Sequence, residues 1–169
     1  MVRVMAVGVF DLLHIGHIKY FNEAASMGDI LVVTITPDRF VNKGPSRPTF
    51  TSALRAEAIS ALEMVDFVLV NSYPTAIEVI DIIKPDIYVK GPDYKNSDDD
   101  LTGNIILEED AVKANGGKIA FTSDDTFSSS SLINEHFSPL KDEQKIFIEK
   151  LKSKYSIDKI KSYLDKLSS

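Results

Sequence analysis

The 169-residue sequence contains no cysteine, which excludes structural disulfides and thiolate metal sites. It also lacks an uninterrupted apolar run long enough to cross a lipid bilayer. The apolar N-terminal segment runs into Gly8 and then Asp11, which is typical of a buried strand and not of a secretory signal. A cytoplasmic location is therefore the default expectation.

Basic residues are in the minority, and the net charge of −6 argues against a nucleic-acid-binding surface. The charge is unevenly spread. Residues 1–140 carry 11 Lys and Arg against 20 Asp and Glu, whereas residues 141–169 carry 8 Lys against 5 Asp and Glu. This shift predicts a main domain at residues 1–138 and a helical tail or linker at residues 139–169.

The body alternates apolar, valine-rich segments with segments whose apolar residues recur at helical spacing. Strands are expected at residues 2–10, 30–35, 66–70, 86–90 and 118–122, and helices at residues 15–26, 51–63, 76–83, 105–114 and from 128–131 onward. This order predicts an α/β fold, a doubly wound and mostly parallel five-stranded sheet covered on both faces. Ligands bind such sheets beyond the carboxyl ends of the strands, where the strand order reverses.

The second expected helix has an N-cap candidate in Thr51 or Ser52. Its apolar residues recur at helical spacing and predict the side that faces the core. That side is expected to consist of Ala53, Leu54, Ala58, Ile59 and Leu62.

The strongest functional signal is His14-Ile15-Gly16-His17, placed between the first strand and the first helix. A helix N-terminus offers unpaired N–H groups and the positive end of a dipole, and two imidazoles add directional donors. Gly16 removes a side chain where a phosphate must approach closely. The pattern favours stabilisation of charge on phosphate oxygens during in-line displacement.

The segment GVFDLLHIGH, residues 8–17, resembles the signature of the HxGH nucleotidyltransferases, a superfamily that includes the class I aminoacyl-tRNA synthetases. The synthetases need a second lysine-rich motif, a large insertion and a tRNA-binding region, for which 169 residues leave no room. The smaller members are more similar, namely glycerol-3-phosphate cytidylyltransferase, heptose-phosphate adenylyltransferase and phosphopantetheine adenylyltransferase. The resemblance implies a Rossmann-like nucleotidyltransferase fold.

Four further segments resemble this family in the same order along the chain. They are the Lys-Gly-Pro-Ser-Arg-Pro loop with Lys43, the helix start with Arg55, the Val-Lys-Gly-Pro-Asp-Tyr segment at 89–94 and the serine run at 128–131. The resemblance implies catalytic roles for His14, His17, Lys43 and Arg55, and contacts with the phosphorylated acceptor for Asp11 and Lys43. It implies nucleotide contacts for Val9, Phe10, Gly16, Lys90, Gly91, Asp93, Tyr94, Ser128, Ser129 and Ser130.

Two acidic features have alternative interpretations. Asp11 follows the first strand and could orient Mg²⁺ or a substrate hydroxyl, or equally serve as a turn carboxylate. The run Asp98-Asp99-Asp100 is interpreted as a solvated loop. The sequence also departs from the family in two places. Ser131, the last serine of the run, stands where relatives place a basic or apolar residue, and Ser123-Asp124-Asp125-Thr126 replaces a basic residue before the run.

The predicted reaction moves a nucleoside monophosphate from CTP or ATP, with Mg²⁺, onto a sugar phosphate or polyol phosphate and releases pyrophosphate. Alternatives are an FAD-synthetase-like or phosphonate-directed transferase, or a non-catalytic nucleotide-binding regulatory module. The body and tail also resemble the cytidylyltransferase-like part of bacterial bifunctional proteins that carry a sugar kinase. A sugar-kinase domain in a longer protein is therefore an expected partner. A homodimer is expected as well, because related enzymes are often dimers.

Overall fold

The computed structural model describes residues 1–43, 47–92, 105–123 and 142–155. Contacts divide the chain into two compact units, Met1–Ser129 and Ser130–Ser169. The described part of the second unit is dominated by helix α6 (Asp142–Lys154). The predicted boundary at residues 138 and 139 and the predicted helix from residues 128–131 lie outside the described residues.

The first unit is built on a sheet whose strands are β1 (Arg3–Gly8), β2 (Ile30–Ile35), β3 (Phe67–Val70), β4 (Ile87–Lys90) and β5 (Lys118–Phe121). The spatial order is β3-β2-β1-β4-β5, and each neighbouring pair is parallel. Val4 of β1 lies opposite Leu31 of β2 and Ile87 of β4. The predicted five-stranded parallel sheet is confirmed.

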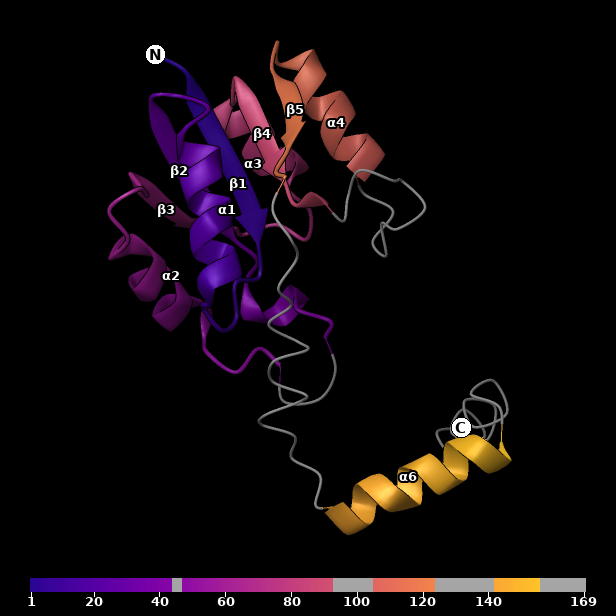
Figure 1. Ribbon diagram of the computed structural model, residues 1–169. Coiled ribbons are helices and arrows are strands. Elements are labelled where there is room, and N and C mark those ends of the chain that lie inside the picture. Colours follow the sequence, from indigo (N-terminus) through magenta and orange to yellow (C-terminus); the bar gives the residue numbers. More distant parts are fainter. Residues whose placement is uncertain (44–46, 93–104, 124–141, 156–169) are drawn as a thin grey trace. The chain divides into compact units, whose positions relative to one another are not determined.

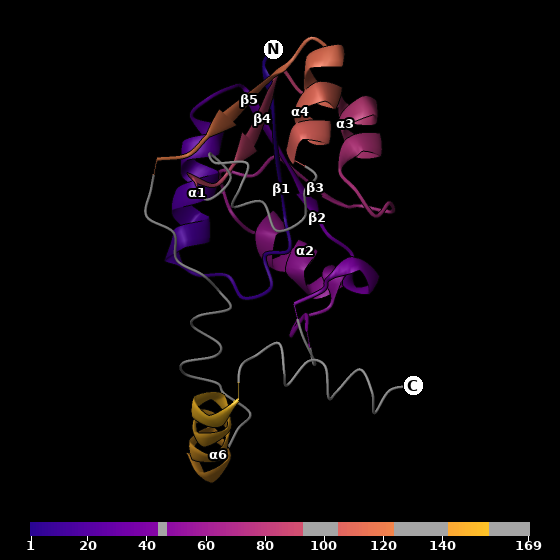
Figure 2. The same cartoon turned by 90° about the vertical axis from the view of Figure 1, so that its right-hand side faces the viewer.

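Helices cover both faces of this sheet (Figure 2). Helices α1 (Ile15–Ala25) and α2 (Ser52–Ser60) lie on one face, and α3 (Ile77–Ile83) and α4 (Ile105–Ala114) lie on the other. Since successive residues of a strand point to opposite faces, Val4 and Ala6 of β1 pack with α1, whereas Met5 packs with α3. In the described part of the chain, no helix is long and apolar enough to span a membrane.

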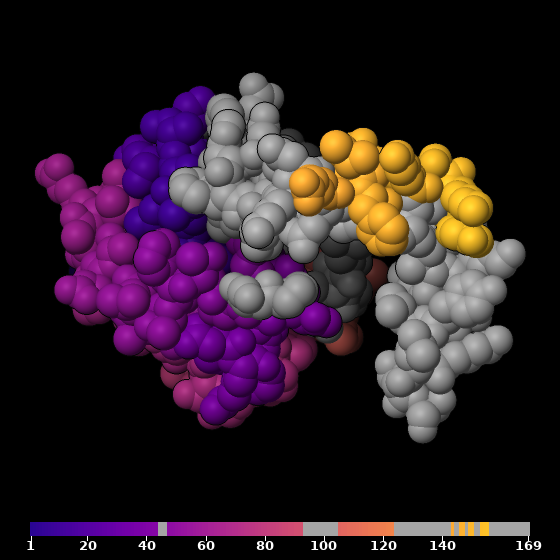
Figure 3. All heavy atoms as spheres, turned by 90° about the horizontal axis from the view of Figure 1, so that it is seen from below, coloured from indigo at the N-terminus to yellow at the C-terminus, as the bar shows by residue number. Residues whose placement is uncertain are grey.

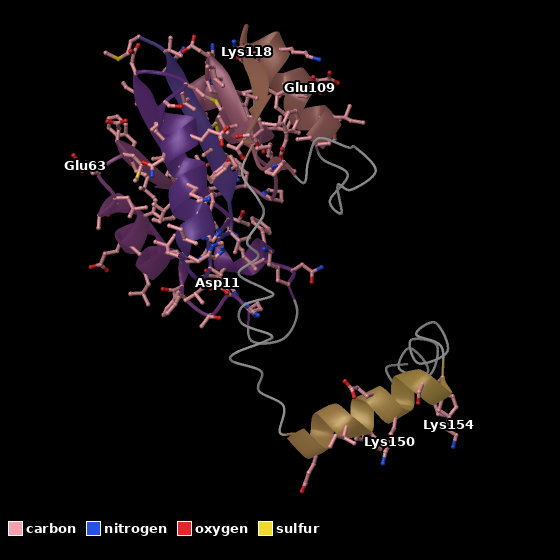
Figure 4. The ribbon with its side chains drawn as sticks, viewed as in Figure 1. Asp11, Glu63, Glu109, Lys118, Lys150 and Lys154 are labelled. Carbon is pink, nitrogen blue, oxygen red and sulfur yellow. The ribbon has the colours of Figure 1, made fainter. Side chains whose placement is uncertain are left out.

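The strand order reverses between β1 and β4. From β1 the chain proceeds outward to β2 and β3, and it then crosses to the other side of β1 to form β4 and β5 (Figure 1). The carboxyl ends of β1 and β4 therefore flank the switch point at which open α/β sheets bind ligands. Figure 4 shows Asp11 just beyond the carboxyl end of β1, and Lys118 at the opposite end of the sheet, where β5 begins.

The predicted buried side of α2 is wrong in part. Leu54 is 52% exposed, and Ala53 and Ala58 are also exposed. Ile59 is fully buried as predicted, and Arg55 is only 2% exposed. The helix is turned so that the guanidinium of Arg55, and not the side chain of Leu54, faces the sheet. Thr51 is confirmed as its N-cap, since its hydroxyl accepts a hydrogen bond from the N–H of Leu54.

Candidate active site

The N-terminus of α1 is organised by His14. This residue is the N-cap, with extended backbone angles of φ −146° and ψ 172°, and its Nδ1 accepts a hydrogen bond of 3.1 Å from the N–H of Gly16. Its carbonyl accepts the first helical hydrogen bonds, from His17 at 2.9 Å and Ile18 at 3.2 Å. Because Nδ1 is an acceptor, a neutral His14 carries its proton on Nε2.

The two histidines of the motif form a stacked pair. Their ring centroids are 3.9 Å apart and their planes differ by 26°. His17 Nδ1 is buried and has no hydrogen-bond partner among the residues that the structure describes. A buried polar atom without a partner is unfavourable unless a ligand or water satisfies it, which makes the pair a candidate binding position.

Burial and neighbouring charges keep both imidazoles neutral near pH 7. Burial, the nearby His14 and the charge of Lys43 lower the pKa of His17 to about 3, against the opposing effect of a hydrogen bond that the ring donates to the backbone of Leu12. Burial also lowers the pKa of His14. A bound polyanion would oppose these effects, because nearby negative charge favours the protonated imidazole.

Asp11 holds the turn after β1 against the segment that leads into α2. It is 7% exposed, and its carboxylate accepts hydrogen bonds from the N–H of Thr49 at 2.9 Å and of Phe50 at 3.0 Å, and from Arg47 at 3.4 Å. Burial acts to raise the pKa of Asp11, but these hydrogen bonds hold it below its ordinary value. Figure 3 views the molecule from below, where the atoms of the N-terminal segment, drawn in indigo, lie beside those of the following segments, drawn in purple.

The predicted role of Asp11 as a metal ligand stays a prediction. Both of its carboxylate oxygens already accept hydrogen bonds from the protein. Among the described residues there is also no group of three His, Asp or Glu side chains that could hold a metal ion. The predicted contact between Asp11 and a substrate stays a prediction.

Lys43 and Arg47 place two cations beside Asp11. Desolvation of its ammonium group is the main cause that lowers the pKa of Lys43, with Arg47 adding to it and Asp11 opposing it, although much of the side chain is exposed. The side chain of Arg47 is only 10% exposed. Sequence reasoning selected Lys43 and missed Arg47, although it is the second cation of the same loop. Together the two residues favour an anionic ligand.

Arg55, a predicted catalytic residue, is engaged by the protein. Its Nε donates to the carbonyl of Phe50 at 3.0 Å, and its Nη2 donates to the carbonyl of Thr36 at 2.8 Å and to Asp38 at 2.7 Å. Its Nη1 donates to the carbonyl of Val9. The guanidinium thus ties the ends of β1 and β2 to the start of α2. These contacts suit a residue that positions the site, and its catalytic role stays a prediction.

The carboxyl end of β4 carries a cation that is also engaged internally. Lys90 is 8% exposed, and its ammonium group lies 2.7 Å from the carboxylate of Glu108 on α4 and 5.2 Å from the ring centre of Tyr88. The Tyr88 hydroxyl donates to the same carboxylate at 3.0 Å. The predicted nucleotide contacts of Lys90 and Gly91 are not tested by this geometry.

Five of the predicted nucleotide-binding residues lie outside the described residues. They are Asp93, Tyr94, Ser128, Ser129 and Ser130. The other five predicted nucleotide-binding residues lie at or just after the ends of β1 and β4, or in the first turn of α1. The structure brings His14, Gly16 and His17 together and places Lys43 within electrostatic reach of His17.

A cavity of about 350 Å³ lies between the turn after β1 and α2. Its lining is mostly apolar and is formed by Phe10, Asp11, Leu12, Leu13, Phe50, Leu54, Arg55 and Ala58. The only charged groups in this lining, those of Asp11 and Arg55, are held by internal contacts. The charged groups of this lining are therefore engaged by the protein, whereas the N-terminus of α1 carries the buried Nδ1 of His17, which has no partner among the described residues.

Comparison with known proteins gives matches over most of the first unit. Residues 5–136 match the family described as cytidylyltransferase-like. The chain is 40% identical over 118 residues to the bifunctional protein HldE of Syntrophotalea carbinolica and 44% identical over 118 residues to that of Gluconobacter oxydans. Each match covers 69% of this chain but 23% of the relative, so the chain spans about a quarter of these curated relatives.

Solved structures show the same fold. A lipopolysaccharide core biosynthesis protein from Thermoplasma volcanium is 32% identical with a TM-score of 0.62, and the match covers 75% of this chain and 99% of that protein. A pantoate-beta-alanine ligase from Francisella tularensis matches with a TM-score of 0.54, 16% identity and coverage of 79% and 65%. At that identity the second likeness concerns the fold alone.

Proposed function

The chain belongs to the cytidylyltransferase-like family, and we propose that it transfers a nucleoside monophosphate from an NTP to a sugar phosphate, with release of pyrophosphate. The observation that carries the proposal is the stacked pair of His14 and His17 at the N-terminus of α1, with the unpartnered Nδ1 of His17. This pair lies beside the switch point of the sheet, within electrostatic reach of Lys43.

The proposed reaction is a single in-line displacement. An oxygen of the acceptor phosphate attacks the α-phosphorus of the NTP, the bond from that phosphorus to the bridging oxygen of the β-phosphate breaks, and pyrophosphate leaves with the bonding electrons. No covalent enzyme intermediate forms. The protein contributes positioning and charge stabilisation, which dominate catalysis of this kind of transfer.

Each residue of the site has a task in this proposal. His14 donates from Nε2 to a phosphate oxygen. The negative charge of the triphosphate raises the pKa of His17, so that its Nδ1 gains a proton to donate. Lys43 and Arg47 attract and orient phosphate groups, while Asp11 and Arg55 hold the turns that carry these residues.

The acceptor proposed here is a sugar phosphate in preference to a polyol phosphate. The support is the structural likeness, at 32% identity, to a protein of lipopolysaccharide core biosynthesis. Both CTP and ATP remain candidates for the donor. The FAD-synthetase-like, phosphonate-directed and regulatory alternatives receive no support from the matches to bifunctional proteins.

The remaining proposals concern partners and conditions. Because the matched relatives are bifunctional and about four times longer than the matched region, we propose that a second catalytic domain, the predicted sugar kinase, accompanies this one. A homodimer, a cytoplasmic location and a requirement for Mg²⁺ with the NTP are retained as proposals. Phe67 and Leu69 of strand β3 at the sheet edge are 57% and 44% exposed, which makes this edge a candidate for the dimer contact.

The test is pyrophosphate release in the presence of Mg²⁺, with each of four NTPs combined with a panel of sugar and polyol phosphates. Release with one sugar phosphate and one NTP supports the proposal and identifies both substrates. His17→Ala is the matched control and should abolish release while leaving the circular dichroism spectrum unchanged. NTP binding without release from any pair would favour the regulatory module.

A further inference from the structure

Phe10 has an unusual backbone conformation directly after β1. Its φ is 50°, in the left-handed region that residues other than glycine rarely adopt. Such a conformation persists only where the surrounding structure imposes it, and it is often found at functional sites. The turn folds the Phe10 side chain back toward the strand, where it is 7% exposed.

Gly8 makes room for this ring. A Cβ atom added at Gly8 would lie 2.7 Å from Cζ of Phe10 and 2.9 Å from Cε1, which is closer than real Cβ contacts. The ring therefore lies flat against the last residue of β1, and a side chain at position 8 would displace it. The positive φ of Phe10 and the glycine two residues before it form one structural device.

The Phe10 ring supports the side chain of His17. The two ring centroids are 5.3 Å apart, and the planes meet at 85° in an edge-to-face contact. Phe10 also packs against Phe21 at 4.9 Å and Tyr20 at 6.2 Å, so it is fixed from the α1 side as well. Phe10 is thus held mainly by protein contacts, and its predicted nucleotide contact stays a prediction.

His17 needs such support because hydrogen bonds alone do not fix it. Its Nδ1 has no partner among the described residues, and the ring donates one hydrogen bond to the backbone of Leu12. Packing must therefore define the plane of the imidazole, with His14 stacked on one side and the edge contact with Phe10 on another. A displacement of a reacting or stabilising group by about 1 Å can reduce a rate by about a hundredfold.

We propose that Phe10 is a positioning residue for catalysis, which holds His17 in the orientation needed to contact the reacting phosphate, and that Gly8 serves it by leaving space for the ring. This inference rests on the proposed function, since it concerns an imidazole there assigned to the transition state. It assigns a role to the turn between β1 and α1 beyond that of carrying the histidine motif.

The first experiment compares Phe10→Leu with the control Phe21→Leu. Both changes remove an aromatic ring from the same buried cluster, but Phe10 contacts His17 by its edge at 5.3 Å while Phe21 lies 6.5 Å away. We expect a similar fall in Tm for the two variants. For Phe10→Leu, kcat for pyrophosphate release should fall about ten- to a hundredfold with KM for the NTP changed less than about twofold. Equal losses of kcat in the two variants would overturn the inference.

The second experiment introduces Gly8→Ala into the wild type and into Phe10→Leu. In the wild type the added methyl group should displace the Phe10 ring and lower kcat by about tenfold or more. In Phe10→Leu the ring is gone, so the same change should lower kcat by less than about twofold. The same loss in both backgrounds would show that Gly8 acts independently of Phe10 and would contradict the proposed device.

A measurement without substrate separates this inference from the proposed function. The pKa of His17 is followed by NMR in wild type, Phe10→Leu and Phe21→Leu. We expect Phe10→Leu to raise it by more than one unit, because water reaches the imidazole, and Phe21→Leu to leave it unchanged. A wild type that releases no pyrophosphate but shows this difference would refute the function and retain only the packing of Phe10 against His17. An active wild type with no such difference would refute the positioning role alone.

Discussion

The carboxyl ends of β1 and β4 lie next to each other in the sheet, yet the polar side chains at the two ends differ in how far protein partners satisfy them. After β1, His17 keeps an unpartnered Nδ1, and Lys43 is partly exposed with a lowered pKa. At the end of β4, Lys90 lies 2.7 Å from Glu108, and both side chains are 9% exposed. One end thus has binding capacity that the described protein groups leave unused, and the other holds its cation in an internal ion pair.

This difference assigns different tasks to the two strand ends. Groups that bind a transition state must be desolvated and oriented before the ligand arrives, and they must not be neutralised by the protein. At the β1 end, His17 keeps a buried Nδ1 that has no partner among the described residues, while the ion pair at the β4 end joins α4 to the sheet. We therefore expect substitutions near β1 to change catalysis, and substitutions in the pair of Lys90 and Glu108 to change the free energy of unfolding.

The largest expected effect is that of Glu108→Gln. It removes the carboxylate charge that lies against the buried ammonium group of Lys90, which should cost about 3 kcal/mol or more of unfolding free energy. Urea denaturation measures the loss. The double variant Lys90→Met with Glu108→Leu should recover most of it, because it replaces the pair by apolar groups. A loss below about 1 kcal/mol for Glu108→Gln would mean that the pair contributes little.

The next effect in size is that of His17→Gln on turnover. Removing one preorganised donor from a transition-state site typically lowers kcat about a hundred- to a thousandfold. Steady-state kinetics should show this fall, with the Tm within a few degrees of the wild type. Lys118→Met is the control and should retain full activity, because Lys118 lies at the amino end of β5, far from the candidate site. Activity of His17→Gln within about threefold of wild type would place the chemistry elsewhere.

Lys43→Met should act mainly on substrate binding. We expect KM for the NTP to rise about tenfold, which corresponds to about 1.4 kcal/mol. Stability should be unchanged or slightly higher, because desolvation of this ammonium group lowers the pKa of Lys43 and the folded state gains nothing from its charge. Lys113→Met removes a cation that is paired with Glu109 on the surface of α4, and it should leave KM unchanged. Equal effects of the two changes would argue against a specific role for Lys43.

His17 also contributes a pH dependence of stability, which develops gradually as the pH falls. Because its pKa is lowered to about 3 from 6.5, the unfolded chain binds more protons than the folded protein between these values. The contribution of His17 to stability is therefore complete above pH 6.5 and is lost as the pH falls, by up to about 1.4 kcal/mol per pH unit. Urea denaturation from pH 7 to 4.5 should show a shallower fall for His17→Gln than for the wild type. Identical slopes would contradict the buried neutral imidazole.

Much of the fold could be predicted from the sequence because apolar segments and turn residues report directly on burial. The strand at Ile30–Ile35 and the helix at Ile105–Ala114 have the predicted bounds. The orientation of α2 could not be predicted in this way. A hydrophobicity pattern favours a buried Leu54 over a buried Arg55, since it contains no information on the four carbonyl and carboxylate groups that satisfy the guanidinium.

The candidate site likewise contains residues that the sequence predicts and contacts that it does not predict. His14, Gly16 and His17 could be found because they are adjacent in sequence and share one helix start. The ion pair of Lys90 with Glu108 joins residues from different elements, and the contact of Phe10 with His17 depends on a positive φ that the sequence does not reveal. Both arise from tertiary packing, and only the structure shows them.

The transfer itself is tested most directly by following the phosphate groups of the donor. The protein is incubated with a sugar phosphate and either α-³²P- or γ-³²P-labelled NTP, using the pair that supports pyrophosphate release. The account predicts that the α-label joins the sugar phosphate while the γ-label leaves as pyrophosphate, and that His17→Gln lacks both products. A γ-label on the sugar, or transfer that survives in His17→Gln, would contradict nucleotidyl transfer at the histidine pair.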